Sequence, residues 1–189
     1  MTNLNASGSF TANAETAGYP PAWRLLHWTI AAIVLAMIPM GIIMANGPDG
    51  PTKDFLYNLH RSLGVTLIPL ILVRLVYRLN HTSPSLPPDL PALQKFAARA
   101  THYALYALLL VQPFVGWIAT SAYPAPILVF GLFQLPPIWR ADRPFSDSMF
   151  FLHRSIGLII ALLVAMHIAA ALYHHFIRRD DVLLRMIRG

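Results

Sequence analysis

The chain has 189 residues, of which 56% are hydrophobic and 12% charged, with a formal net charge of +6 and no cysteine. So high an apolar fraction with so few charges is unusual for a soluble domain and indicates a membrane protein. The absence of cysteine excludes thiolate metal sites, iron–sulfur clusters, disulfides and covalent c-type haem attachment. In a membrane protein a basic balance follows from topology, so no nucleic-acid partner is expected.

Residues 1–22 contain no Lys or Arg and no apolar core, so they lack the parts of a cleaved signal peptide and are expected to form a flexible polar tail. Four apolar windows follow, and each is long enough to cross a hydrocarbon layer about 30 Å thick as a helix of about 20 residues. These windows are Leu25–Ala45, Leu59–Leu79, His102–Ala122 and Leu152–Tyr173.

Two connections separate the later spans. Residues 80–91 form a Pro-rich stop between the second and third spans. Residues 123–148 are too apolar for an ordinary loop and too broken by Pro and Gly for a span, so they are expected to lie along the membrane interface or to cover the bundle mouth, with Tyr123 and Trp139 at headgroup depth. The sequence therefore predicts an all-α membrane protein with a four-helix bundle at 23–179 and a short basic tail at 180–189.

The basic residues predict the orientation. Four spans place both termini on one side, together with the connection 80–91. Nine of the fourteen basic residues fall on that side, which the positive-inside rule assigns to the cytoplasm: Arg24, Arg74, Arg78, Lys95, Arg99, Arg178, Arg179, Arg185 and Arg188.

A nearly duplicated hexapeptide marks the outer ends of two spans. "LHRSLG" at 59–64 opens the second window and "LHRSIG" at 152–157 opens the fourth. His167 follows His153 by 14 residues, which is almost four helical turns, so both lie on nearly one face with about 21 Å of rise between them. The outer layer thus holds His60 and His153, and the inner layer holds His27, His102 and His167.

Paired imidazoles inside a membrane, with no carboxylate in the spans, suit two noncovalent b-type haems. Ligation by two histidines closes both axial positions of an iron and favours electron transfer over oxygen binding. A lone histidine near a helix end is more often an interfacial polar residue, and His81, His174 and His175 are interpreted in that way. The duplicated hexapeptide, the matched depths and the 14-residue spacing together favour haem.

Other residues of the repeat have candidate roles around these haems. Gly64 and Gly157 follow their histidines by four residues, where a missing side chain would admit a flat macrocycle, although they would equally serve close helix packing. Arg74 lies 14 residues after His60 and could pair with a propionate. Arg61 and Arg154 could bind outer propionates or attract an anion, and snorkelling to lipid phosphates is the alternative for all three arginines.

The chain also resembles a known family, the small bacterial cytochromes b561, which are four-helix di-haem cytochromes of the inner membrane. The resemblance covers about residues 20–188 and is carried by "LLHWTIA", "LHRSLG", "LVRLVYR", "PFVG" and, most specifically, "MHIAAALYHHFIRRDDVLLRM". It implies that His27 pairs with His167 for the inner haem and that His60 pairs with His153 for the outer haem, which sets His102 aside as a non-ligand.

The resemblance further implies electron transfer between haem and membrane quinone. A close member suggests superoxide oxidation, in which superoxide is the donor at the outer face and ubiquinone the acceptor. Arg61, Arg154 and the neighbouring outer cations are compatible with attraction of a small anion. The segment 124–139 is a candidate wall for the quinone. Two alternatives are a cytochrome subunit that serves a partner dehydrogenase or hydrogenase, and a haem-free transporter or scaffold.

Overall fold

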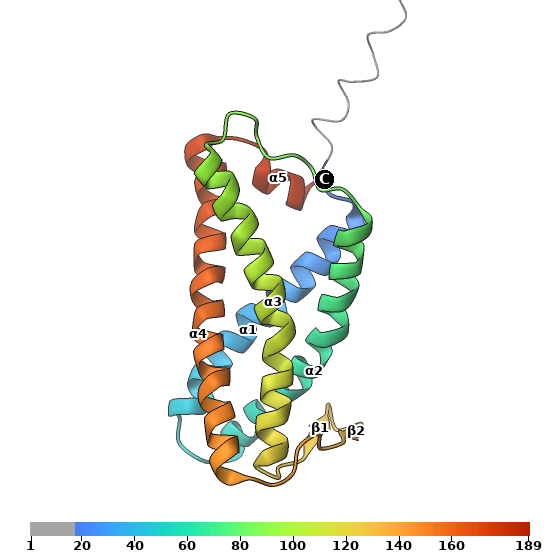
Figure 1. Ribbon diagram of the computed structural model, residues 1–189, viewed down its shortest axis with the longest axis vertical. Coiled ribbons are helices and arrows are strands. Elements are labelled where there is room, and N and C mark those ends of the chain that lie inside the picture. The colour runs from blue at the N-terminus through green and yellow to red at the C-terminus, as the bar shows by residue number, and fades with distance from the viewer. Residues whose placement is uncertain (1–17) are drawn as a thin grey trace, which may run out of the picture.

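The structure, a computed structural model, describes residues 18–189, so most of the predicted N-terminal tail lies outside the described residues. Four long helices run up and down one bundle (Figure 1): α1 Pro21–Asn46, α2 Pro51–Asn80, α3 Ala92–Ala122 and α4 Arg143–Tyr173. All four are long and apolar enough to cross a membrane. The predicted all-α bundle with four membrane spans is confirmed.

Proline and a capping carboxylate set the starts of these helices. Pro21 and Pro51 occupy the first turns of α1 and α2, where proline has no backbone hydrogen bond to lose. The side chain of Asp142 accepts a hydrogen bond of 3.1 Å from the backbone N–H of Phe145 and so caps α4. Helices α1, α2 and α4 begin at these signals, several residues before their apolar windows.

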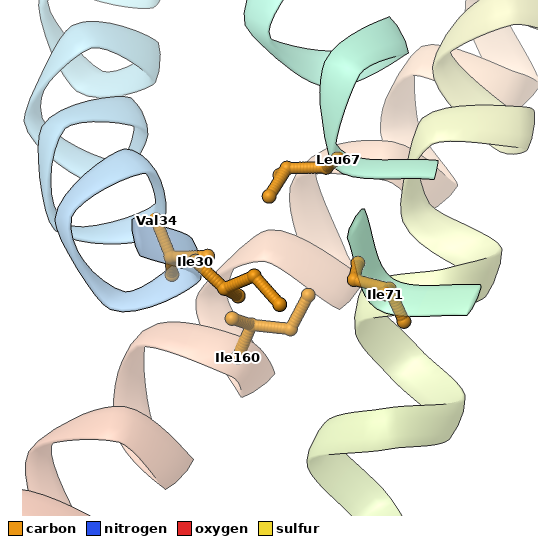
Figure 2. Close-up of a cluster of buried hydrophobic side chains, with 5 residues drawn as sticks. All are labelled: Ile30, Val34, Leu67, Ile71 and Ile160. Atoms are coloured by element: carbon orange, nitrogen blue, oxygen red, sulfur yellow. The ribbon is translucent and has the colours of Figure 1, made fainter. Parts of the chain in front are cut away.

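Helices that are consecutive in the chain pack side by side: α1 on α2, α2 on α3, and α3 on α4. Midway along the bundle, Ile30 and Val34 of α1 meet Leu67 and Ile71 of α2 and Ile160 of α4 (Figure 2). None of these five side chains is more than 6% exposed. We call this group the apolar belt. Its residue on α4, Ile160, lies seven positions from both His153 and His167. The belt therefore separates the two predicted histidine layers.

Both ends of the described chain lie at the same end of the bundle, which we call the terminal end (Figure 1). After α4, a π-helical turn η1 (His174–Arg178) and a left-handed Arg179 lead into the short helix α5 (Val182–Ile187). The side chains of Arg24 and Trp28 each donate a 3.0 Å hydrogen bond to backbone oxygens of α5. The predicted basic C-terminal tail is therefore a helix held against α1.

A β-hairpin at the opposite end, the hairpin end, was not predicted from the sequence. Strand β1 (Ile127–Val129) pairs antiparallel with β2 (Phe133–Leu135). Ser62 of α2 anchors it, because the Ser62 hydroxyl accepts a 2.9 Å hydrogen bond from the backbone N–H of Phe130. The side chain of Arg61 donates a weaker bond of 3.3 Å to the Pro126 carbonyl. The first hexapeptide therefore positions this segment over α2.

Replacing Ser62 with alanine is expected to release the hairpin from α2. A buried hydrogen bond lost in this way costs about 1–3 kcal/mol, so backbone amides of residues 127–135 should exchange with deuterium roughly tenfold faster or more. Ser155→Ala is the matched control, because among the described residues the Ser155 hydroxyl bonds only the Phe151 carbonyl of its own helix. Equal protection of the hairpin in both variants would show that Ser62 does not anchor it.

Candidate functional site

Two histidines face each other near the hairpin end. His60 comes from α2 and His153 from α4, and their ring centroids are 6.1 Å apart with an interplanar angle of 73°. The Nδ1 atom of each ring is buried and has no hydrogen-bond partner among residues 18–189. A buried imidazole nitrogen without a partner is costly. The two hexapeptides therefore bring together a pair of imidazoles suited to a further ligand.

Three histidines meet at the terminal end. His27 of α1 and His167 of α4 have ring centroids 6.1 Å apart at 73°, the same geometry as the first pair. His102 of α3 is closer to His167, with a centroid distance of 5.2 Å and an angle of 84°. The Nδ1 atom of His102 lies 2.6 Å from the Ala98 carbonyl of its own helix. The structure thus places His102 within this group.

The pairs fit a metal ion bound from opposite sides by two imidazoles. A metal–imidazole bond is about 2 Å long. The distance between the two ring centres is the sum of two such bonds and the two distances from ring centre to nitrogen, or roughly 6 Å. The observed distances of 6.1 Å match this expectation, and 5.2 Å does not. No group of three or more His, Cys, Asp or Glu in the described part of the chain could hold a bare metal ion. The donor set therefore suits a haem iron, whose porphyrin supplies the other ligands.

Glycines of the flanking helices lie against the histidine pair at the hairpin end. A Cβ atom at Gly116 of α3 would stand 2.9 Å from Cε1 of His153, and one at Gly41 of α1 would stand 3.8 Å from Cε1 of His60. Of these two positions, only 116 requires glycine, because a side chain there would come too close to the His153 ring. The sequence motif "PFVG" contains Gly116 but does not reveal this contact. Glycines in membrane spans often serve close helix packing, so the contact becomes evident only when the neighbouring imidazole is seen.

Gln112 of α3 is a second residue that the sequence did not reveal. Its side-chain nitrogen donates a 2.8 Å hydrogen bond to the backbone carbonyl of His153. A Cβ atom at Gly157 would stand 3.3 Å from the same nitrogen, whereas one at Gly64 would meet only the Met37 methyl at 3.8 Å. The two hexapeptide glycines thus have different surroundings, and the one on α4 makes room for Gln112.

The three predicted arginines have different environments. The Arg74 guanidinium donates a 3.2 Å hydrogen bond to the Trp23 carbonyl and lies 5.8 Å from the Tyr106 ring centroid, at the depth of the terminal-end histidines. The Arg61 guanidinium lies 5.4 Å from the ring centroid of Tyr57. Arg154 is exposed and makes no hydrogen bond, ion pair or ring contact with the described residues. The two hexapeptide arginines are therefore not equivalent.

A transmembrane four-helix bundle whose imidazoles face each other in pairs at two depths has the architecture of a membrane-embedded b-type cytochrome. The profile of the prokaryotic cytochrome b561 family matches residues 18–189. The chain belongs to this family. Its members are membrane electron-transfer proteins that bind b-type haem, so this chain has an oxidoreductase or electron-transfer role.

Individual relatives span nearly the same length. The chain is 33% identical to cytochrome b561 homolog 2 of Escherichia coli K12 over 183 residues, which cover 95% of each protein. It is 30% identical to cytochrome b561 homolog 1 of the same organism over 86% of this chain and 92% of that protein. A probable superoxide oxidase CybB from Yersinia pestis is 23% identical over 86% of this chain and 91% of its own.

Proposed function

We propose that residues 23–179 form a di-haem cytochrome b that carries electrons from superoxide to ubiquinone. The observation that supports this most strongly is the pair of matched imidazole contacts, both at 6.1 Å and 73°. His60 and His153 would hold one haem, and His27 and His167 the other. Bound b-type haem supplies a one-electron carrier at each depth.

The chain itself would hold these groups in place and keep them dry. Two imidazoles from different helices would hold each haem, and such a pair would leave no position on the metal for a substrate. The apolar belt excludes water between the two layers because Ile30, Leu67 and Ile160 are nearly fully buried. Arg74 lies at the depth of the inner pair, where its guanidinium could bind a propionate. These residues favour rapid one-electron transfer through a rigid, apolar interior.

In the proposed reaction, two superoxide anions lose one electron each and become two molecules of O₂. The two electrons and two protons convert one ubiquinone into ubiquinol.

At the hairpin end, Arg140 and Arg154 are exposed and make no ion pair with the described residues, whereas Lys53 is paired with Asp49 at 2.9 Å. The two exposed arginines would attract the anionic donor, and the relative named a probable superoxide oxidase supports this choice of donor.

We further propose that the terminal end faces the cytoplasm of a bacterium and the hairpin end faces outward. Nine of the fourteen basic residues belong to the terminal end, as the positive-inside rule requires. Superoxide would then arrive from outside, and membrane ubiquinone would be reached through the lipid.

The test is ubiquinone reduction by the purified protein in liposomes with a superoxide source. We expect ubiquinol formation without any partner protein. The rate should fall several-fold between low salt and 1 M salt, where the screening length is about 3 Å. Arg140→Gln/Arg154→Gln should show a slower rate and a weaker salt dependence. If the purified protein alone were inactive and quinone were reduced only when a co-purified dehydrogenase was present, the chain would instead be the cytochrome subunit of that enzyme.

A further inference from the structure

A small cavity at the terminal end adjoins the three-histidine group: His102 lines it, but none of the four histidines of the two 6.1 Å pairs does. It has a volume of about 250 Å³ and is enclosed by the starts of α1 and α3, the end of α2, α5 and the segment 83–86. Three arginines line it: Arg74 and Arg78 from α2 and Arg99 from α3. No Asp or Glu is among its lining residues. The cavity is therefore strongly positive.

The carboxylates at this end of the described chain are committed elsewhere. Asp89 and Asp180 pair with Arg178 at 2.7 and 3.0 Å, and Asp181 pairs with Arg185. Burial of Asp180 opposes its ionisation, but hydrogen bonds from His174 and Arg178 outweigh burial and hold the pKa of Asp180 below its usual value. Asp180 is thus an anion already neutralised by its own partners.

The cavity arginines consequently have no ion-pair partner among residues 18–189. Arg78 lies 5.7 Å from the Trp23 ring centroid, and Arg74 bonds the Trp23 carbonyl. Neither contact neutralises charge. Several guanidinium groups held together in a partly closed space are stabilised by a bound anion.

Two further features indicate the kind of anion. The hydroxyl oxygen of Ser83, another lining residue, is buried and has no hydrogen-bond partner among the described residues. Arg99 is exposed and Tyr103 is 66% exposed, so α3 opens the cavity to the outside of the bundle, where the end of a span meets lipid headgroups. Guanidinium and hydroxyl donors suit phosphate oxygens, and tyrosine at this depth is typical of the membrane interface.

We propose that this cavity binds the phosphate headgroup of an acidic phospholipid, such as phosphatidylglycerol. Basic pockets between transmembrane helices bind acidic lipid headgroups in other membrane proteins. Arg78 and Arg99 would bind the phosphate, and Ser83 would donate a hydrogen bond to it. Arg74, deeper in the cavity, remains available to the inner histidine layer. The proposal does not depend on the electron donor or acceptor.

Native mass spectrometry of the purified, haem-loaded protein tests this site with phosphatidylglycerol and phosphatidylcholine as probes. The wild-type protein should retain phosphatidylglycerol preferentially. Arg78→Gln/Arg99→Gln should weaken that retention roughly 30-fold, because each cation near a membrane surface contributes about 1 kcal/mol. A control for position is Arg179→Gln, which removes one charge from the same end outside the cavity and should bind like the wild-type protein.

Equal retention of the two lipids, or unchanged retention by the double variant, would overturn the proposal. So would displacement of the lipid by millimolar inorganic phosphate, which would assign the cavity to a free anion. Haem absorbance, measured in parallel, should remain at the wild-type level in the double variant. Loss of haem together with an unchanged lipid count would instead assign these arginines to haem carboxylates.

Discussion

Replacing His167 with alanine is expected to remove the b-type haem nearer the terminal end and to leave the other in place. His153→Ala should have the converse effect, because α4 contributes one imidazole to each pair. Each substitution would remove one of the two histidines that we propose to hold that haem, so the haem would be held from one side only. Haem-to-protein ratios, combined with a redox titration, should show two haems in the wild-type protein, as proposed, and one haem in each variant.

His27→Ala and His102→Ala decide which imidazole faces His167. The 6.1 Å contact of His27 matches the hairpin-end pair, whereas the 5.2 Å contact of His102 does not. We therefore expect His27→Ala to lose one haem and His102→Ala to retain both. Loss of a haem in His102→Ala with retention in His27→Ala would reverse the assignment, and an absence of b-type absorption from the wild-type protein would refute the cytochrome.

Gly116→Ala should weaken the hairpin-end haem selectively. The added methyl group would stand 2.9 Å from Cε1 and 3.2 Å from Nδ1 of His153, so the imidazole would have to rotate or move away. Overpacking of this kind costs about 1–3 kcal/mol, which corresponds to roughly tenfold weaker haem binding or more. The electron paramagnetic resonance signal of that haem should shift, because it reports the relative orientation of the two imidazoles.

Gly41→Ala is the matched control for that variant. It also places a methyl group beside an imidazole of the hairpin-end pair, but at 3.8 Å from Cε1 of His60, which is an ordinary van der Waals contact. We expect Gly41→Ala to keep both haems and the wild-type spectrum. Equal loss in the two variants would show that any added volume beside these rings is harmful, and no loss in either would show that His153 can move freely.

Part of the fold was predictable because the bilayer imposes a simple rule on the sequence. A span needs an apolar run of a minimum length, so four windows predicted four helices, and all four are present. The depths of His60 and His153 followed from their places at the ends of two windows, and the depth of His167 followed from helical rise. The hairpin 127–135 could not be predicted in this way, because its position depends on the Ser62 hydroxyl, which is distant in sequence.

The symmetry of the two hexapeptides is limited to their histidines. Ser62 anchors the hairpin, whereas Ser155 bonds its own helix. Arg61 contacts Tyr57 and the Pro126 carbonyl, whereas Arg154 has no described partner. Identical residues acquire different roles here because α2 and α4 have different neighbours in the bundle.

The sequence by itself determined the membrane class, the four spans and the layers in which the histidines lie, since hydrophobicity and helical rise are properties of each segment alone. The pairing of His60 with His153 followed from depth, but the choice of His27 over His102 as the partner of His167 was implied only by the family resemblance. The tertiary structure showed the facing rings directly, and it alone revealed that Gly116 contacts His153 and that three arginines line one cavity without a carboxylate. Those contacts depend on the rotation and the neighbours of each helix. Periodicity along one segment carries no information about which residue of another segment lies opposite.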